Sequence, residues 1–288
     1  MNEGPGENEP ENALSCASFK RPNEPTDKTP YQQMMDTWEL EYHQMSEAQQ
    51  IHAIAVIWKC AEIRDPEDIL FCEKVAANGV PEAQQGLAIL YREGVDVEKD
   101  LNKAFRWMKS AAEQELRLAQ YNLGTHYARG EGVETSPTQA LHWFRRAANN
   151  GLIHAQLQLG NMYLYGMDIQ RSPVEAVKWY REAAWNNDPV GQRRMGLLCQ
   201  HGIGVERDET AALQWFKLAS SNGDADASFQ LGLAFESGST VPRDLEAARK
   251  WFALAVEQGH EEAEVYLEWL EVSIELMREL SSIRGERG

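Results

Sequence analysis

Apolar residues recur along the chain at a fixed interval. A column of small residues repeats every 36 positions without insertion. Further apolar residues follow each copy four positions later and the first five copies eight positions later. Chance does not keep several columns in register over five periods, so the chain is built from repeated units. A binding site has no reason to recur in every unit, so we expect these columns to form the core. The small-residue column is Ala83, Ala119, Ala155, Gly191, Ala227 and Ala263, and a Trp column is Trp107, Trp143, Trp179, Trp215 and Trp251.

Each unit has the pattern of two helices joined by a turn. Ala119, Leu123 and Tyr127 are spaced by four, which places them on one face of a first helix. Gly124 would let a neighbouring helix approach closely. After a Gly-rich loop, the second helix begins at a residue whose side-chain oxygen can cap it. It ends at a glycine that can adopt the left-handed backbone conformation. The predicted N-caps are Asp65, Asp100, Ser136, Ser172, Asp208 and Asp244, and the predicted helix-ending glycines include Gly79, Gly151, Gly223 and Gly259.

These signals agree on an all-α fold of antiparallel helix pairs with no sheet. Residues 1–30 are rich in Pro, Glu and Asn and poor in apolar side chains, so we expect a disordered acidic tail. Residues 31–81 are predicted to form N-terminal capping helices and a degenerate repeat, and residues 82–261 five repeats. Residues 262–288 are predicted to form a C-terminal capping helix and tail.

The C-terminal helix carries two apolar stripes, whereas a simple cap needs only one. We expect the second stripe to bind the N-terminal helix, a second copy of the chain in a homodimer, or a partner protein. The first stripe is Ala263, Leu267, Leu270, Ile274 and Met277, and the second is Val265, Trp269, Val272 and Leu276.

The charge of the chain bears on its partners. The formal net charge of −17 argues against binding to nucleic acid or anionic lipid and favours basic protein partners. The sequence has no stretch of 18 apolar residues, so it predicts no membrane span. The first residues lack the pattern of a signal peptide. Cys16, Cys60, Cys72 and Cys199 follow no regular pairing, so we expect free buried thiols. Together these features predict a cytoplasmic protein.

Residues with catalytic chemistry are scattered. The seven histidines show no metal-ligand spacing, and the chain has no nucleophile elbow or P-loop. Cys199 and His201 are the only close Cys–His pair, but residues two apart on a helix face different directions. We therefore expect no enzyme activity, no catalytic residue, no metal and no organic cofactor.

The repeat resembles the Sel-one-like repeat, a relative of the tetratricopeptide repeat. The clearest copy runs from Ala119 to Gly151 and contains Leu-Gly, a Tyr, a Gly-x-Gly-Val loop and a Trp-Phe pair. The resemblance covers roughly residues 66–270. It implies a right-handed superhelical solenoid that acts as a non-catalytic adaptor or scaffold and binds a protein or peptide in its concave groove. Some bacterial members confer immunity against toxins, so the alternative is a cytoplasmic immunity or inhibitor protein that neutralises a basic toxin or enzyme.

Some positions depart from the family pattern. Glu115 and Asn187 replace the usual helix-ending glycine, and Ala88 replaces the glycine of the first full repeat. Met167 and Asp168 alter the third loop. We interpret these departures as tolerated drift or as sites where a loop has been re-aimed.

The resemblance also implies where a partner would bind. In the packing of tetratricopeptide repeats the first helices line the concave face, and side chains at fixed offsets from the small-residue column point into it. Leu157, Tyr165, Leu197 and Phe229 would then be apolar anchors, and Arg193 would contact a carboxylate. The alternatives are core packing for the apolar side chains and ion pairs with Glu for the arginines. The expected partner-binding residues are Tyr121, Arg129, Leu157, Asn161, Leu164, Tyr165, Arg193, Leu197, His201, Phe229, Leu233 and Trp269.

Overall fold

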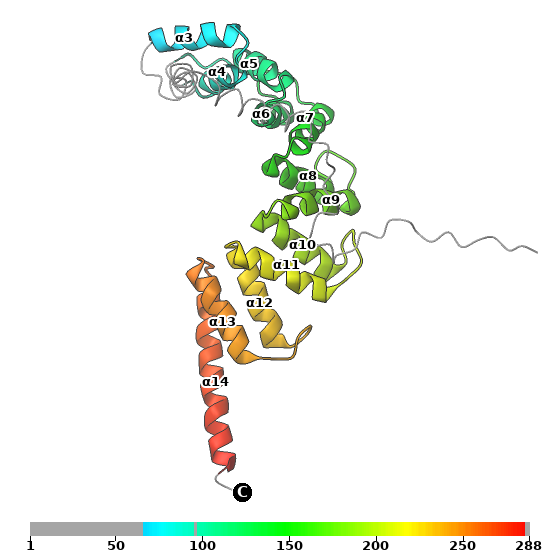
Figure 1. Cartoon of the computed structure of the whole chain (residues 1–288), viewed down its shortest axis with the longest axis vertical. Helices are drawn as coiled ribbons and strands as arrows, with labels where there is room; N and C mark the ends of the chain where they lie inside the picture. The colour runs from blue at the N-terminus through cyan, green and yellow to red at the C-terminus, as the bar shows by residue number, and fades with distance from the viewer. Residues whose placement is uncertain (1–65, 95–96, 286–288) are drawn as a thin grey trace, which may run out of the picture. The chain divides into compact units, whose positions relative to one another are not determined.

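The computed structural model of the chain describes residues 66–94 and 97–285. These residues form twelve helices and no strand, and the helix pairs repeat every 36 residues (Figure 1). The predicted all-α solenoid of helix pairs is therefore confirmed. Among the described residues, one compact unit ends at Gln170 and the other begins at Arg171. The predicted N-terminal tail, most of the predicted N-terminal cap and the N-cap Asp65 lie outside the described residues.

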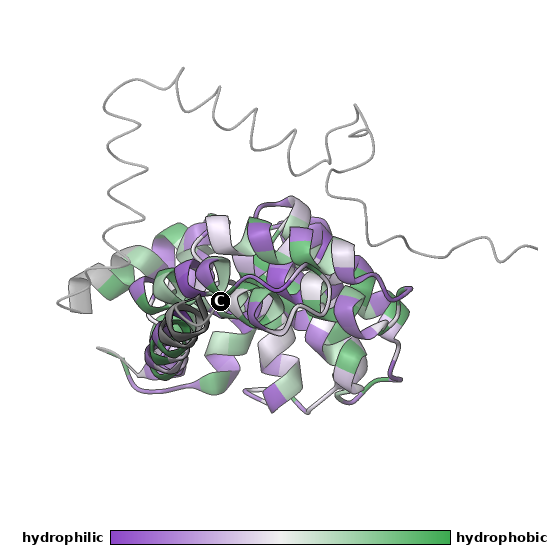
Figure 2. Cartoon of the chain, turned by 90° about the horizontal axis from the view of Figure 1, so that it is seen from below, coloured by the Kyte–Doolittle hydropathy of each residue, from purple (hydrophilic) through white to green (hydrophobic). Residues whose placement is uncertain are grey.

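The N-terminal unit contains six of the described helices, each 12 or 13 residues long. The helices of the chain carry both apolar and polar residues (Figure 2), as expected when one face packs and the other meets solvent. The helices are α3 (Pro66–Ala77), α4 (Pro81–Glu93), α5 (Leu101–Glu113), α6 (Arg117–Arg129), α7 (Pro137–Asn149) and α8 (Ile153–Tyr165).

The C-terminal unit continues the same pattern and ends differently. Its last helix is 23 residues long, whereas the five before it have 13 residues each. The helices are α9 (Pro173–Trp185), α10 (Pro189–His201), α11 (Glu209–Ser221), α12 (Ala225–Ser237), α13 (Leu245–Glu257) and α14 (Ala263–Gly285).

The second helices begin where the sequence predicts. The Asp100 carboxylate accepts a hydrogen bond from the backbone N–H of Lys103 at 2.9 Å, and Ser136, Ser172, Asp208 and Asp244 cap their helices in the same way.

Two further caps were not predicted from the sequence. The side chains of Asp188 and Asp224 cap first helices α10 and α12, whereas the N-cap residues of α6 and α8 are Leu116 and Leu152, which have no capping oxygen. The aspartate caps are thus found on the first helices of the C-terminal unit.

The glycine that follows the Leu of the first helix allows the two helices of a repeat to approach closely. A Cβ atom added to Gly232 would lie 2.5 Å from the ring of Phe252, and one added to Gly124 would lie 2.7 Å from the ring of Phe144. Such distances are too short for a carbon contact, so these positions exclude any larger residue unless the ring moves. The predicted close approach is confirmed.

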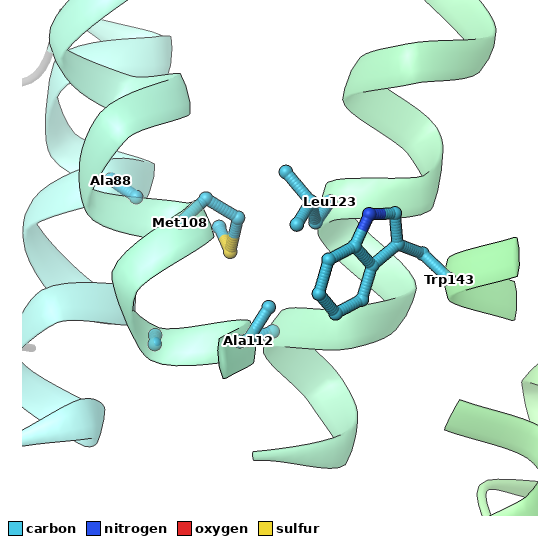
Figure 3. Close-up of a cluster of buried hydrophobic side chains, with 7 residues drawn as sticks. Ala88, Met108, Ala112, Leu123 and Trp143 are labelled. Carbon is cyan, nitrogen blue, oxygen red and sulfur yellow. The ribbon is translucent and has the colours of Figure 1, made fainter. Parts of the chain in front are cut away.

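Ala88 shows how one repeat tolerates a side chain at this glycine position. In this repeat Met108 stands at the position that Phe144 holds in the next repeat. Ala88 and Met108 are both fully buried in one cluster with Leu123 and Trp143 (Figure 3). Methionine is flexible and fills irregular space, so it can make room for the extra methyl group. The departure at Ala88 is therefore matched by a second departure at Met108.

The Trp column is less uniformly buried than its recurrence predicts. Trp143 and Trp215 are buried, with 7% and 1% of their surface exposed, but Trp107, Trp179 and Trp251 are only half-buried. The prediction of a uniform Trp core is therefore wrong for these three residues.

The ends of the second helices keep a left-handed backbone even without glycine. Gly79, Gly151 and Gly223 have φ between 78° and 93°, as predicted, and Glu115 and Asn187 adopt φ values of 65° and 59° at the equivalent positions. A left-handed conformation is unfavourable for a residue with a Cβ atom. The turn geometry therefore overrides the preference of the residue.

The cysteines follow the prediction only in part. Cys72 is a buried free cysteine, as predicted. Cys199 is fully buried and disulfide-bonded, so the predicted free thiol is wrong at this position. Cys16 and Cys60 lie outside the described residues.

Candidate partner-binding surface

The predicted binding residues fall on the first helices, and their position along the helix decides their exposure. Two residues after the small-residue column, the side chain turns toward the second helix of its own repeat. There the Tyr121 ring lies 5.3 Å from the Phe144 ring, and Tyr121 and Leu157 are both half-buried. This column is therefore largely part of the packing between the two helices.

Phe229 occupies the same column, and the structure corrects its predicted role. Only 7% of its surface is exposed, and its ring stacks on His260 at 4.2 Å and lies 5.5 Å from Phe252. Leu233 is half-buried and packs against the same cluster. Phe229 is therefore a core residue of the C-terminal unit, because Phe252 of α13, Tyr266 of α14 and the His260 ring enclose it, and it is no anchor for a partner.

Arg193 is also engaged within the chain. Its guanidinium lies 2.9 Å from an oxygen of Asp224 and 3.2 Å from an oxygen of Asp226. The His260 ring lies 3.6 Å from the other oxygen of Asp226. Arg193 therefore forms ion pairs, with aspartates in place of the glutamates of the expected alternative, and its contact with a partner's carboxylate stays a prediction.

Six residues after the small-residue column, the predicted residues are mostly half-buried. Asn161 and Leu197 are half-buried in this column, and Leu164, three residues after Asn161, is also half-buried. Trp269 differs, because 55% of its surface is exposed on α14. Leu233 lines a pocket of about 150 Å³ together with Gln200 and Phe216.

Ten residues after the small-residue column, the side chain is exposed in each of the five first helices from α4 to α12. This tenth-position column is the last residue of each first helix from α4 to α12. It changes from acid to base to aromatic to imidazole to hydroxyl, whereas the apolar core columns contain no charged side chain in these repeats. Tyr165 has 60% of its surface exposed, and Met167 two residues later is exposed as well. The column consists of Glu93, Arg129, Tyr165, His201 and Ser237.

His126 brings an ionisable group into the core of the N-terminal unit. The ring is fully buried, and its Nδ1 lies 2.8 Å from the backbone oxygen of Glu131, while Nε2 has no partner. Burial lowers the pKa of His126, although the Glu131 carbonyl and carboxylate partly oppose the shift. The ring is therefore held neutral and acts as a core residue.

Glu115 forms the centre of a polar cluster at its left-handed turn. Its carboxylate accepts hydrogen bonds from Asn150 at 3.0 Å and Gln120 at 2.7 Å, and it forms an ion pair with Arg146. Burial would raise the pKa of Glu115, but these partners outweigh burial and lower the pKa below its usual value. The cluster stabilises the ionised acid at a position where most repeats have glycine.

Sequence reasoning missed a ladder of buried glutamines that joins the repeats. The side chain of each donates to the backbone oxygen eight residues earlier, as Gln120 does to Ala112 at 3.4 Å. The side-chain oxygens of Gln84, Gln120 and Gln192 accept from the amide at the end of the next second helix, as Gln120 does from Asn150 at 3.0 Å. The signal was present in the sequence as a column at the 36-residue period, formed by Gln84, Gln120, Gln156 and Gln192.

The described residues contain neither a metal-binding cluster nor a helix that could cross a membrane. Across residues 66–94 and 97–285, no group of three His, Cys, Asp or Glu side chains is placed to hold a metal ion. Within the same part of the chain, no helix has the length and apolar character that crossing a membrane requires.

Comparison with known proteins gives a consistent family. The Sel1 repeat matches five consecutive segments, residues 81–116, 117–152, 153–188, 189–224 and 225–260. No curated protein matches the chain.

Two solved structures are similar in sequence and fold. One is c5321, a protective antigen of uropathogenic Escherichia coli with an SLR fold, at 32% identity and a TM-score of 0.65 over 70% of this chain. The match covers 44% of that protein, so this chain spans less than half of its length. The other is a Sel1 repeat protein of Oxalobacter formigenes, at 30% identity and a TM-score of 0.63, which covers 68% of this chain and 81% of that one.

A third likeness is weaker. The immunity protein Pa5087 of Pseudomonas aeruginosa is 22% identical, with a TM-score of 0.41 over 72% of this chain and 82% of that one. At this level the likeness carries no argument about function.

Proposed function

Because the chain belongs to the Sel1 repeat family, with five consecutive repeats over residues 81–260, we propose that it is an adaptor that binds a protein or peptide through the exposed ends of its first helices. Sel1 repeat proteins are generally protein-interaction scaffolds and typically not enzymes. The proposal adds a location to this family property. The cytoplasmic location expected from the sequence stays a prediction.

The tenth-position column carries the proposal. A position that only supports the fold varies within narrow limits: the Phe column holds large apolar residues in every repeat, and the Gln column holds glutamine in four of the five repeats. The tenth position is exposed in every repeat and differs in chemistry each time, including Arg129, Tyr165 and His201. Rigid helices hold these side chains in place, so binding requires little ordering of the surface. Tyr165 is the expected anchor, because aromatic side chains contribute most to interfaces.

The experiment compares the proteins retained by the tagged chain with those retained by a Tyr165→Ser variant. Leu218→Ser is the matched control, because Leu218 is an exposed apolar residue on the second helix α11. We expect a partner that the parent and the control retain and that Tyr165→Ser loses, with a drop in affinity of about tenfold or more in a titration with the purified partner. Equal affinity of all three proteins would contradict the proposal.

The alternative, a basic toxin or enzyme held by the acidic surface, has a different salt response. Attraction between exposed charges weakens steeply with salt, whereas the contacts of an aromatic side chain that becomes buried in an interface do not. Neutralising Glu261, Glu262 and Glu264 removes three exposed acids from the start of α14. Loss of the partner in this variant and in high salt, with full binding by Tyr165→Ser, would favour the alternative.

A further inference from the structure

The last helix leaves an apolar stripe uncovered. The inner stripe of α14 packs on the C-terminal core, with Ala263 and Leu270 buried. The outer stripe faces away from that core, and its side chains have between 55% and 67% of their surface exposed. The outer stripe is Val265, Trp269, Val272 and Leu276.

The position of this stripe in the repeat explains why it is uncovered. In α6 and α12, the residue two positions after the small-residue column packs on the second helix, as Tyr121 does on Phe144 and Phe229 on Phe252. Val265 holds this position in α14 and is exposed. Within the described residues no helix follows α14. The outer stripe is therefore a face shaped to receive a helix, and the described chain does not supply one.

A row of acids runs along one side of the outer stripe. Each residue of the stripe is directly preceded by an exposed glutamate. The stripe has spacings of four, three and four, which is the seam of a helix that pairs with another helix. Glu268 and Glu275 then flank the seam, where opposite charge on the partner helix would be favourable, and Glu264 and Glu271 lie one row further from it. The row is Glu264, Glu268, Glu271 and Glu275.

We propose that the outer stripe of α14 binds a basic amphipathic helix of a partner protein, with apolar residues on the stripe and Lys or Arg beside the acidic row. The overall charge of −17 favours such a partner at longer range. This surface lies in the C-terminal unit and is independent of Tyr165.

Charge argues against two other occupants. In an antiparallel pair of two copies, Glu268 of one α14 faces Glu275 of the other, and a parallel pair places no cation beside the row. The stretch 31–63 of this chain also has an apolar pattern, but it holds five acidic residues and one lysine. Neither occupant places a row of Lys or Arg residues opposite the acidic row of α14.

The test uses two synthetic helical peptides of three heptads, one with Leu at the seam and Lys beside it, the other with Glu in place of Lys. Fluorescence anisotropy of the labelled peptides measures their binding to the full chain. We expect the basic peptide to bind at least about tenfold more tightly than the acidic one, and Trp269→Ala to weaken it about tenfold or more. Trp269 is exposed, so its removal should leave the melting temperature nearly unchanged.

A charge swap supplies the matched control. Glu268→Lys with Glu275→Lys should reverse the preference toward the acidic peptide. Glu98→Lys with Glu134→Lys changes the net charge equally at exposed residues of the N-terminal unit and should leave the preference unchanged. Equal binding of both peptides to the parent, or an equal effect of the two double variants, would overturn the proposal. A dimer in sedimentation that Trp269→Ala dissociates would also overturn it, in favour of a second copy.

Discussion

Single residues in this protein show how burial changes chemistry that the sequence suggests. Arg193 has the character of a binding residue but is neutralised by Asp224 and Asp226. His126 is polar but is buried where the equivalent residue of α8 is Met162. In both cases the neighbours decide the role of the side chain, so the predictions at this scale concern buried polar residues.

The first prediction concerns His126 and pH. The pKa of His126 is lowered in the folded state from an ordinary value of 6.5, so the neutral ring contributes stability that is present above that pH and is lost as the pH falls through and below it. His126→Met should therefore raise the melting temperature more at about pH 5 than at about pH 8. Glu131 and Arg92 are the charged groups that act on the ring, so both stay unchanged in the variant.

Melting curves of the parent and the variant across this pH range check the prediction. Glu115 adds a separate dependence in more acid solution, because its lowered pKa stabilises the fold above its ordinary value of 4.5 and this stability is lost as the pH falls below that value. That dependence should persist in His126→Met. An identical pH profile for both proteins near neutrality would show that His126 does not titrate on unfolding.

The second prediction concerns the glutamine ladder. Gln120→Ala removes the side chain that donates to the buried Ala112 oxygen and accepts from the Asn150 amide, so each of these groups loses one hydrogen bond. The loss should lower the free energy of unfolding by about 1–3 kcal/mol. Gln214→Ala on the exposed face of α11 is the control and should change it by less than about 0.5 kcal/mol. Urea unfolding measures both, and equal values would contradict a structural role for the ladder.

At the scale of the element, the two helices of a repeat are held by a matched pair of positions. Glycine on the first helix accompanies a Phe ring on the second at Gly124, Gly196 and Gly232, whereas alanine accompanies methionine in the first repeat. The contact distance between the helices therefore depends on the two residues together. A change at one position should be tolerated only with a change at the other.

The third prediction tests this coupling. Gly232→Ala places a methyl group 2.5 Å from the Phe252 ring and should destabilise the C-terminal unit by about 1–3 kcal/mol. The combination with Phe252→Met copies the pair Ala88 and Met108 and should be more stable than the sum of the two single changes predicts. Unfolding free energies of the four proteins in a double-mutant cycle measure the coupling. A coupling of zero would mean that the pairing in the first repeat is coincidental.

At the scale of the whole molecule, stability should be distributed along the chain. In a repeat protein each unit contacts its neighbours, so the free energy is roughly a sum of local terms and interfaces. The described residues divide into two compact units at Gln170 and Arg171. Damage to one repeat is therefore expected to remain local.

The fourth prediction concerns this locality. Trp215→Ala removes a side chain that is only 1% exposed and should lower the free energy of unfolding by about 3–5 kcal/mol. Trp179 is half-buried, so Trp179→Ala should lower the free energy of unfolding by less. Amide hydrogen exchange in Trp215→Ala should accelerate in α10 to α13 and much less in α4 to α6. Uniform acceleration along the described helices would indicate a single cooperative unit.

The repeat, its helix pairs and their ends were predictable from the sequence alone. Helix formation and capping depend on residues close together in the chain, so Asp100 and Gly151 could be interpreted without knowledge of distant contacts. The core columns were predictable for a related reason, because each repeat places them in the same surroundings. This applies to Ala119 and Leu123, both fully buried.

The tertiary structure decided which faces of these helices remain accessible. A helical position determines the direction of a side chain but not which element covers it. Phe229 and Val265 have the same position in their repeats, yet α13 covers Phe229 and no described helix covers Val265. The same limit applies to Trp179 and Trp215, which share a column and differ in burial. Exposure depends on contacts between residues that are distant in the chain, and therefore only the folded molecule decided which of the sequence-predicted binding residues remain accessible.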